Sequence, residues 1–156
     1  MEDLEKEEII VKKFGLHPSQ NDYEEIKTLF LDEIKNRKKL KTLSLEEIKN
    51  LGEEEGCGDY LRTLCFMIFY LGHVEDCISI WEAKSIDMDT FCYIDVGLTC
   101  GGGYDETIKY ISDKPKLAKM KSYLEECFAL EESDGFEQFD RERLIKSFEN
   151  FYRNTF

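Results

Sequence analysis

Residues 59–81, DYLRTLCFMIFYLGHVEDCISIW, contain the pattern that decides the fold. The segment 60–71 is almost wholly apolar, yet it is far shorter than the roughly 20 residues needed to cross a bilayer, so it predicts a buried helix. Gly72 and His73 interrupt that helix. Apolar residues then resume at helical spacing, at Val74, Cys77, Ile78 and Trp81. Two helices joined so closely are expected to pack as an antiparallel hairpin.

Helical spacing also marks the chain on both sides of this hairpin. The apolar positions are Tyr23, Ile26, Phe30 and Ile34 upstream, and Leu117, Met120, Leu124, Cys127, Phe128, Leu144, Ile145, Phe148, Phe151 and Tyr152 downstream. Ser44 with Glu47 predicts a capped short helix through Leu51, and Asp59 is the expected cap of the apolar helix. The basic run 35–41 suits the negative end of a helix dipole.

These patterns predict an all-α fold, an irregular helical bundle built from helical hairpins. A solenoid-like stack is the alternative, although no repeat of fixed period is present. The size and the apolar content suit one domain over residues 1–156. Residues 1–18 form, as one option, a loosely attached N-terminal segment.

Residues 92–111, CYIDVGLTCGGGYDETIKYI, are the exception to simple helical spacing. Every second residue from Cys92 to Cys100 is apolar, as in a strand. A lone strand would have no partner elsewhere, so we favour a helix here, with Asp89 as its N-cap. The choice between helix and strand over 91–100 stays open at this point.

The glycine run 101–103 does not match a phosphate-binding loop. A Walker loop needs a lysine directly after its second glycine, whereas Gly102 is followed by another glycine and a tyrosine. A dinucleotide fingerprint fails because Glu106 stands where the third glycine belongs. We therefore expect a tight turn, with Asp105 and Glu106 opening the next helix.

The composition restricts the possible ligands. Thirty-four acidic residues against 21 basic ones give a net charge of −13, which disfavours nucleic acid and anionic membranes. The acidic N-terminus has no apolar signal region, so we expect a cytoplasmic protein. The six cysteines include no CxxC pair and lie at no metal-ligand spacing from His17 or His73. They predict free thiols, no metal and no cofactor.

No catalytic motif is present, so the sequence predicts a binding protein and not an enzyme. Carboxylates are frequent enough to form catalytic-looking pairs by chance, and no GxSxG elbow occurs. Acidic residues are concentrated between 74 and 113, a segment that contains nine acidic residues and two lysines. Such a concentration steers a cationic protein. The candidate partner-binding residues are Glu75, Asp76, Trp81, Asp87, Asp89, Asp95, Asp105 and Glu106.

Two segments, IWEAKSIDMDTF (80–91) and IDVGLTCGGGYDETIKYI (94–111), resemble bacterial toxin-immunity proteins. The resemblance implies that the chain binds a cognate toxin, often a basic nuclease, and covers its active site. It fixes no contact residue, because immunity proteins have many unrelated folds. The alternative is a helical adaptor or regulatory scaffold that binds a protein partner through an apolar groove.

Overall fold

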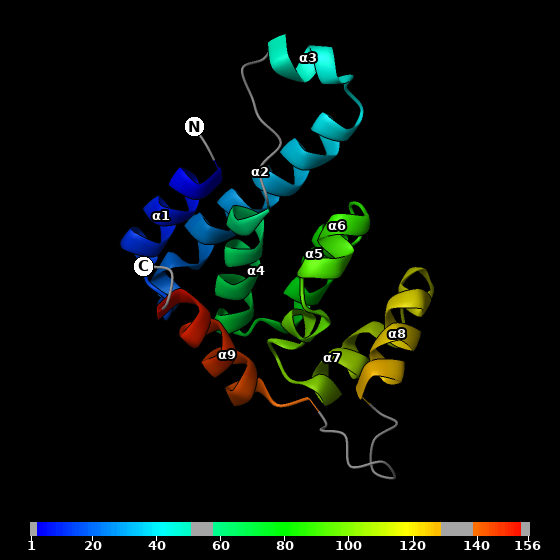
Figure 1. Ribbon diagram of the computed structural model, residues 1–156. Coiled ribbons are helices and arrows are strands. Elements are labelled where there is room, and N and C mark those ends of the chain that lie inside the picture. Colours follow the sequence, from blue (N-terminus) through cyan, green and yellow to red (C-terminus); the bar gives the residue numbers. More distant parts are fainter. Residues whose placement is uncertain (1–2, 51–57, 129–138, 154–156) are drawn as a thin grey trace.

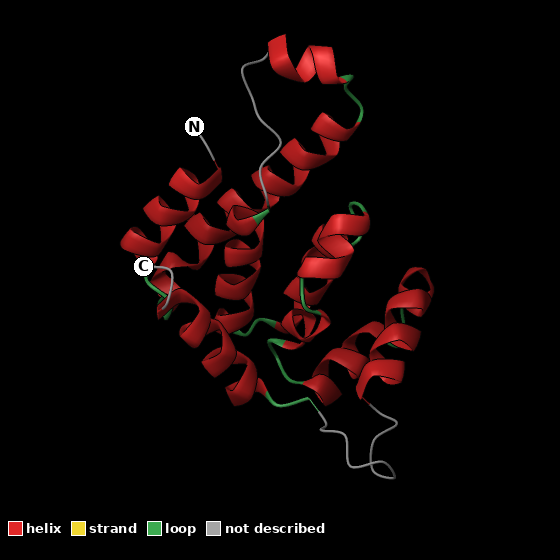
Figure 2. Cartoon of the chain, viewed as in Figure 1, coloured by secondary structure: helices red, strands yellow, loops and turns green. Residues whose placement is uncertain are grey.

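The computed structural model describes residues 3–50, 58–128 and 139–153, and within these ranges the chain is helical with no strand (Figures 1 and 2). The all-α prediction is therefore confirmed. The α-helices are α1 (Asp3–Phe14), α2 (Tyr23–Lys41), α3 (Leu45–Asn50), α4 (Asp59–Leu71), α5 (Cys77–Lys84), α6 (Met88–Tyr93), α7 (Tyr104–Ile111), α8 (Ala118–Phe128) and α9 (Arg141–Arg153). Short 3-10 helices connect them: η1 (Gln20–Asp22), η2 (Val74–Asp76), η3 (Val96–Cys100) and η4 (Pro115–Leu117).

Helix α4 is the centre of the larger core. Its apolar residues are buried all round, because α1, α2 and α9 cover it from different sides (Figure 1). Ile26, Phe30 and Ile34 of α2 and Ile10 and Phe14 of α1 are buried in the same core. A helix that is apolar on every face is stable in water only when other helices enclose it, which explains why this segment organises the fold.

Helix α9 returns from the end of the chain to pack on α4. The rings of Phe148 and Phe66 stack with centroids 4.7 Å apart. Tyr152 is buried and its hydroxyl contacts that of Thr63. In a solenoid each repeat contacts only its neighbours along the chain, whereas here the last helix packs on a central one. The arrangement is thus an irregular bundle.

Helix α1 is part of this core. The sequence left open a loosely attached segment over residues 1–18, but Glu7, Ile10 and Phe14 are all buried. The Thr63 hydroxyl donates a 2.9 Å hydrogen bond to the Glu7 carboxylate. The hydroxyl groups of Thr63 and Tyr152 also contact each other. One polar chain therefore ties α1, α4 and α9 together.

A second, smaller core joins α5, η3, α7 and α8. Its buried residues are Cys77, Cys100, Ile111, Met120 and Leu124. The cysteines behave as small apolar side chains here, and burial raises the pKa of the Cys77 thiol to about 12. Helices α7 and α8 form a hairpin beside α5 (Figure 1).

The segment 91–100 is helical but broken. Helix α6 ends at Tyr93, and Asp95 then caps η3 by accepting a 2.7 Å hydrogen bond from the amide of Gly97. The expected helix is correct in type, although it consists of two short pieces. Asp87, not Asp89, is the N-cap of α6, since its carboxylate accepts from the amide of Thr90 at 2.8 Å. Likewise Gly58, with φ 89°, precedes α4 where Asp59 was the expected cap.

The glycine run turns a corner, as predicted, and also allows close packing. A Cβ on Gly101 would lie 2.6 Å from the Phe69 carbonyl oxygen, so α4 and this turn meet backbone to backbone. Gly103 has a φ of 99°, which opens α7 in a conformation that favours glycine. The Arg141 guanidinium donates to the carbonyls of Gly101 and Tyr70 at 3.1 and 2.7 Å. Arg141 thus fastens α9 to the ends of α4 and η3.

The substitution Gly101→Ala is expected to destabilise the fold by about 1–3 kcal/mol, because the added methyl group meets rigid backbone. Urea unfolding measures this loss. Gly97→Ala is the matched control: its methyl group would meet the end of the Leu144 side chain at 2.9 Å and the Asp95 carboxylate at 3.1 Å, both of them side-chain atoms and not backbone. Equal stability of the two variants would contradict the close-packing role of Gly101.

Glu7 predicts a pH dependence of stability. Burial is the largest cause that raises the pKa of its carboxyl, so the folded protein keeps this proton to higher pH than the unfolded chain. The free energy of unfolding should therefore fall as pH rises above the ordinary glutamate range, until the folded pKa has been passed. Glu7→Gln should remove this part of the fall, and Glu5→Gln, on the exposed side of α1, should not. Urea titrations at several pH values test this, and parallel pH profiles for wild type and Glu7→Gln would refute it.

Candidate partner-binding surface

An open groove of about 460 Å³ lies between α5 and α6 on one side and α8 on the other. Its floor consists of three aromatic side chains, Trp81, Phe91 and Tyr123. The ring centroids of Phe91 and Tyr123 are 5.3 Å apart, and those of Trp81 and Tyr123 are 5.8 Å apart. The rings touch each other at steep angles and remain half-buried. The groove therefore presents a continuous aromatic floor to the outside.

Helical spacing on α8 explains its wall of the groove. Met120 and Leu124 point into the second core. The groove is lined instead by Lys119, Ser122, Tyr123 and Glu126, which share one face of the helix. Tyr123 and Ala118 supply the apolar part of that wall, and Lys119 and Glu126 stand on either side of Tyr123 along the helix.

Lys84 supports the aromatic floor from inside. Its side chain is buried, and the ammonium donates hydrogen bonds to the carbonyls of Phe91 and Ile94. The same ammonium lies 4.3 Å from the centroid of the Phe91 ring. Burial lowers the pKa of Lys84, while the charge of Asp95 acts in the opposite direction. This lysine holds α6 against α5, and so fixes where Phe91 lies.

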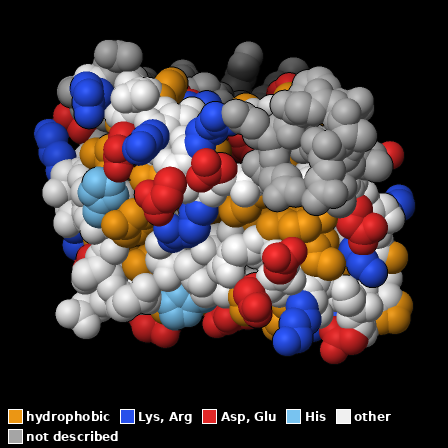
Figure 3. All heavy atoms as spheres, turned by 90° about the horizontal axis from the view of Figure 1, so that it is seen from below, with side chains coloured by type: hydrophobic (Ala, Val, Ile, Leu, Met, Phe, Trp, Pro, Cys, Tyr) orange, Lys and Arg blue, Asp and Glu red, His pale blue; other side chains and the backbone are white. Residues whose placement is uncertain are grey.

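The predicted acidic residues form two groups and not one face. Glu75 lies in η2, beside α7, whose first turn carries Asp105 and Glu106. Asp87 and Asp89 lie past the other end of α5. An eight-residue helix is about 12 Å long, so this distance separates the groups, with Trp81 between them. The face seen in Figure 3 shows acidic side chains interspersed with basic and apolar ones.

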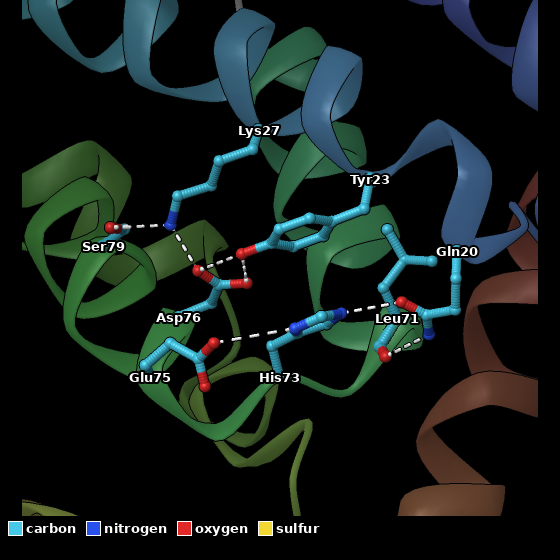
Figure 4. A network of polar contacts seen from close by, with 8 residues as sticks. All are labelled: Gln20, Tyr23, Lys27, Leu71, His73, Glu75, Asp76 and Ser79. Carbon is cyan, nitrogen blue, oxygen red and sulfur yellow. Dashed lines mark hydrogen bonds and ion pairs between the residues drawn. The ribbon is translucent and has the colours of Figure 1, made fainter.

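Asp76 is not available to a partner, which corrects its assignment from the sequence. The residue is 2% exposed, and its carboxylate pairs with the Lys27 ammonium and accepts a 2.8 Å hydrogen bond from Tyr23 (Figure 4). The ring of His73 stacks on that of Tyr23 with centroids 4.0 Å apart. Asp76 therefore joins α2 to the turn between α4 and α5. The apolar spacing gave no sign of this pairing.

The other predicted partner-binding residues differ in their exposure and in the contacts that they make within the fold. Asp87 is half-buried and engaged as the α6 cap, and Asp95, though exposed, binds the Gly97 amide. Glu75 is exposed and lies 3.6 Å from His73. Asp89, Asp105 and Glu106 are exposed and make no ion pair within the described residues. Trp81 lies on the groove floor, between the core and the surface.

Sequence reasoning misses most of the groove. The sequence alone does not single out Phe91 and Tyr123, nor Met88, which is 76% exposed one helical turn before Phe91 on α6. A signal is nevertheless present, because Tyr123 lies at the edge of the apolar stripe of α8 that contains Met120 and Leu124, beside the polar face of the helix. That position could have suggested a second use for the helix. The convergence of α5, α6 and α8 required the structure.

The described part of the chain shows neither a metal-ligand cluster nor a membrane-spanning helix. No group of three histidine, cysteine, aspartate or glutamate side chains there could hold a metal ion. None of the described helices is both long enough and apolar enough to cross a membrane. Cys65, Cys77 and Cys100 are buried, Cys92 is exposed, and Cys57 lies outside the described residues.

Replacing Lys84 by methionine is expected to cost about 1–3 kcal/mol of stability, since two buried carbonyls lose their donor while the side-chain volume is nearly kept. Phe91 should shift, and the fluorescence of Trp81, the single tryptophan, should change with it. Urea unfolding and an emission spectrum measure both effects. Lys109→Met, on the exposed side of α7, is the control. An unchanged emission spectrum in Lys84→Met would show that Lys84 does not position the floor.

Comparisons with known proteins identify no relative of the chain. No family model, curated protein or solved structure matches the chain. Its function must therefore be inferred from the chemistry of its own residues. The groove between α5, α6 and α8, with the exposed carboxylate of Glu126 in its lining, is the feature that offers such chemistry.

Proposed function

We propose that the chain is a binding protein for a cationic protein partner, and that its biological role is to neutralise a basic toxin as an immunity protein does. The observation that carries the proposal is an aromatic groove with Glu126 in its lining and Asp89 on the adjoining helix α6, two exposed carboxylates that make no ion pair within the described residues. Interfaces commonly combine buried aromatic anchors with a charged rim. We regard the chain as a binder, since the aromatic groove offers a contact surface for a partner.

The unpaired carboxylates would act at long range. Asp89, Asp105 and Glu106 add to a net charge of −13, and their field attracts a basic surface before contact. Carboxylates engaged within the fold, such as Asp76, contribute less because Lys27 neutralises the charge locally. Focused charge of this kind raises association rates, and salt weakens the effect.

The aromatic floor would act at short range. Tryptophan and tyrosine are enriched at binding hot spots, since each buries a large area with little loss of side-chain entropy. Trp81 is half-buried in the free protein, so a partner could cover the rest of its ring. Contact of this kind would persist at salt concentrations that screen the carboxylates.

The second candidate is a helical adaptor, and the mainly apolar lining of the groove is the observation that favours it. An adaptor of this type would bind a neutral amphipathic helix and depend little on salt. Proteins captured from an extract separate the two functions: a cationic protein that arrests growth supports the toxin, and a neutral partner without toxicity supports the adaptor.

Reversal of Asp89, Asp105 and Glu106 to lysine should slow association with the captured partner by about tenfold or more, because the local field changes sign. Surface plasmon resonance at low and high ionic strength measures this. When the partner is expressed in a bacterial host, growth should stop, and co-expression of the wild-type chain should restore it. The triple variant should restore growth less well.

The matched control reverses Glu24, Glu46 and Glu47, which are also exposed and also lie in first helical turns, on α2 and α3. Both triple variants change the net charge equally and affect helix dipoles alike. Equal effects of the two on association would show that only net charge matters. Electrostatic recognition would be excluded if binding of the partner were unaffected by salt and by both triple variants.

A further inference from the structure

We propose that the groove between α5, α6 and α8 receives one large apolar side chain of the cationic partner, aromatic or leucine, with a basic residue beside it that pairs with Glu126. This inference rests on the proposed function, because it specifies the chemistry of the same partner. It adds a single anchoring position and a direction in which the partner chain lies. The chemistry of the group that binds in the groove is inferred from the aromatic floor, from Lys84 beneath it and from the charged residues at its rim.

The floor selects an apolar group over a cation. An aromatic cage holds a cation among separated rings, but the Trp81, Phe91 and Tyr123 centroids are only 5.3–6.3 Å apart, so the rings are in contact. No space for an ammonium remains between them. What they present outward is a joined apolar surface, which a flat or branched hydrocarbon side chain can cover.

The buried Lys84 side chain beneath the aromatic floor is a second, independent reason to expect an apolar group and not a cation on the rings. The Lys84 ammonium already lies 4.3 Å from the Phe91 centroid and 6.0 Å from that of Tyr123. A second cation placed directly on these rings would be repelled by the buried charge. The positive groups of the partner are therefore expected at the rim, beside the rings and not on them.

The charged residues at the rim of the groove determine at which end of α8 the basic residue of the partner lies. Lys119 and Glu126 both line the groove and stand seven residues apart on α8, about 10 Å along its axis. Glu126 is exposed and forms no ion pair in the described part of the chain, whereas Glu125 pairs with Lys121. Asp95 adds negative charge near Tyr123, whose pKa is raised first by burial and also by that carboxylate. The basic residue of the partner should thus lie toward the C-terminal end of α8.

Met88 extends the apolar surface on the α6 side. Its side chain is 76% exposed, one turn before Phe91, and such exposure of a large apolar group suits a contact surface. Asp89, directly after it, is unpaired within the described residues and offers a second position for a basic group. Charge complementarity therefore favours a basic partner over a second copy of this acidic chain.

The test selects binders from random sequences, so the identity of the natural partner does not have to be assumed. A displayed library of random linear peptides is panned against the full chain, and recovered peptides are synthesised with a fluorescent label. We expect them to share one aromatic residue or leucine beside lysine or arginine. Their binding, followed by anisotropy of the label and by Trp81 emission, should weaken at least about tenfold when the apolar residue becomes alanine.

Ser122→Trp fills the groove from an exposed position of α8 and leaves the core untouched. It should abolish binding of the selected peptides, and Ser147→Trp, at an exposed position of α9, should not. Glu126→Gln should weaken peptides that carry the basic residue and leave those with its alanine replacement unchanged. Circular dichroism checks that each variant folds.

The outcomes separate this inference from the proposed function. Recovery of no peptides, of peptides without an apolar anchor, or of peptides that bind Ser122→Trp normally would overturn the anchor. The proposed function would still stand if the captured cationic partner binds in a salt-dependent way. Loss of that salt dependence with the groove intact would refute the function instead. A groove that is occupied by a second copy of this chain in solution would overturn the anchor in favour of self-association.

Discussion

The enclosure of α4 is the constraint on which the rest of the structure depends. Its buried residues, including Leu61, Leu64, Phe66 and Phe69, would bring a strongly unfavourable contact with water if any covering helix were absent. The covering helices come from both ends of the chain, α1 and α2 from the start and α9 from the finish. Because α9 must come back to α4, the α5–α8 segment between them is displaced to one side, where its own smaller core forms.

The joint between these two parts decides where the groove lies. Gly101 brings the turn after η3 onto the backbone of Phe69, and Arg141 binds carbonyl oxygens on both sides of that contact. Helix α5 follows α4 through a turn that Asp76 anchors to α2. Trp81 packs against the smaller core, but its helix α5 also buries Ile80 and Ala83 in the main core, whereas Tyr123 is carried by a helix that packs in the smaller one.

Much of the fold could be predicted because helical periodicity in the sequence reflects burial directly. The apolar helix that ends before Gly72, the long helix after Pro18 and the amphipathic helix with Met120 and Leu124 were all recognisable in this way. The caps were less predictable. Asp87 and Asp89 stand two residues apart with the same chemistry, and only the backbone geometry decides which of them accepts from Thr90. The alternation over 92–100 does not follow burial: Cys92 is exposed, whereas the 3-10 helix buries consecutive residues from Gly97 to Cys100.

The candidate site was less predictable than the fold, since it depends on which exposed residues meet in space. Acidic spacing in the sequence suggested one face, but Asp76 faces Lys27 and the remaining carboxylates lie on both sides of Trp81. This arrangement separates two physical effects. Charges at two ends of α5 can attract a partner over about a Debye length, ~8 Å at physiological salt, without being desolvated themselves. The aromatic floor between them can then be covered while Glu126, which lines the groove, pairs with a basic residue of the partner, since burial of an unpaired carboxylate would cost more than an exposed ion pair returns. A binding surface with its charge at the edges and its rings in the middle meets both requirements at once.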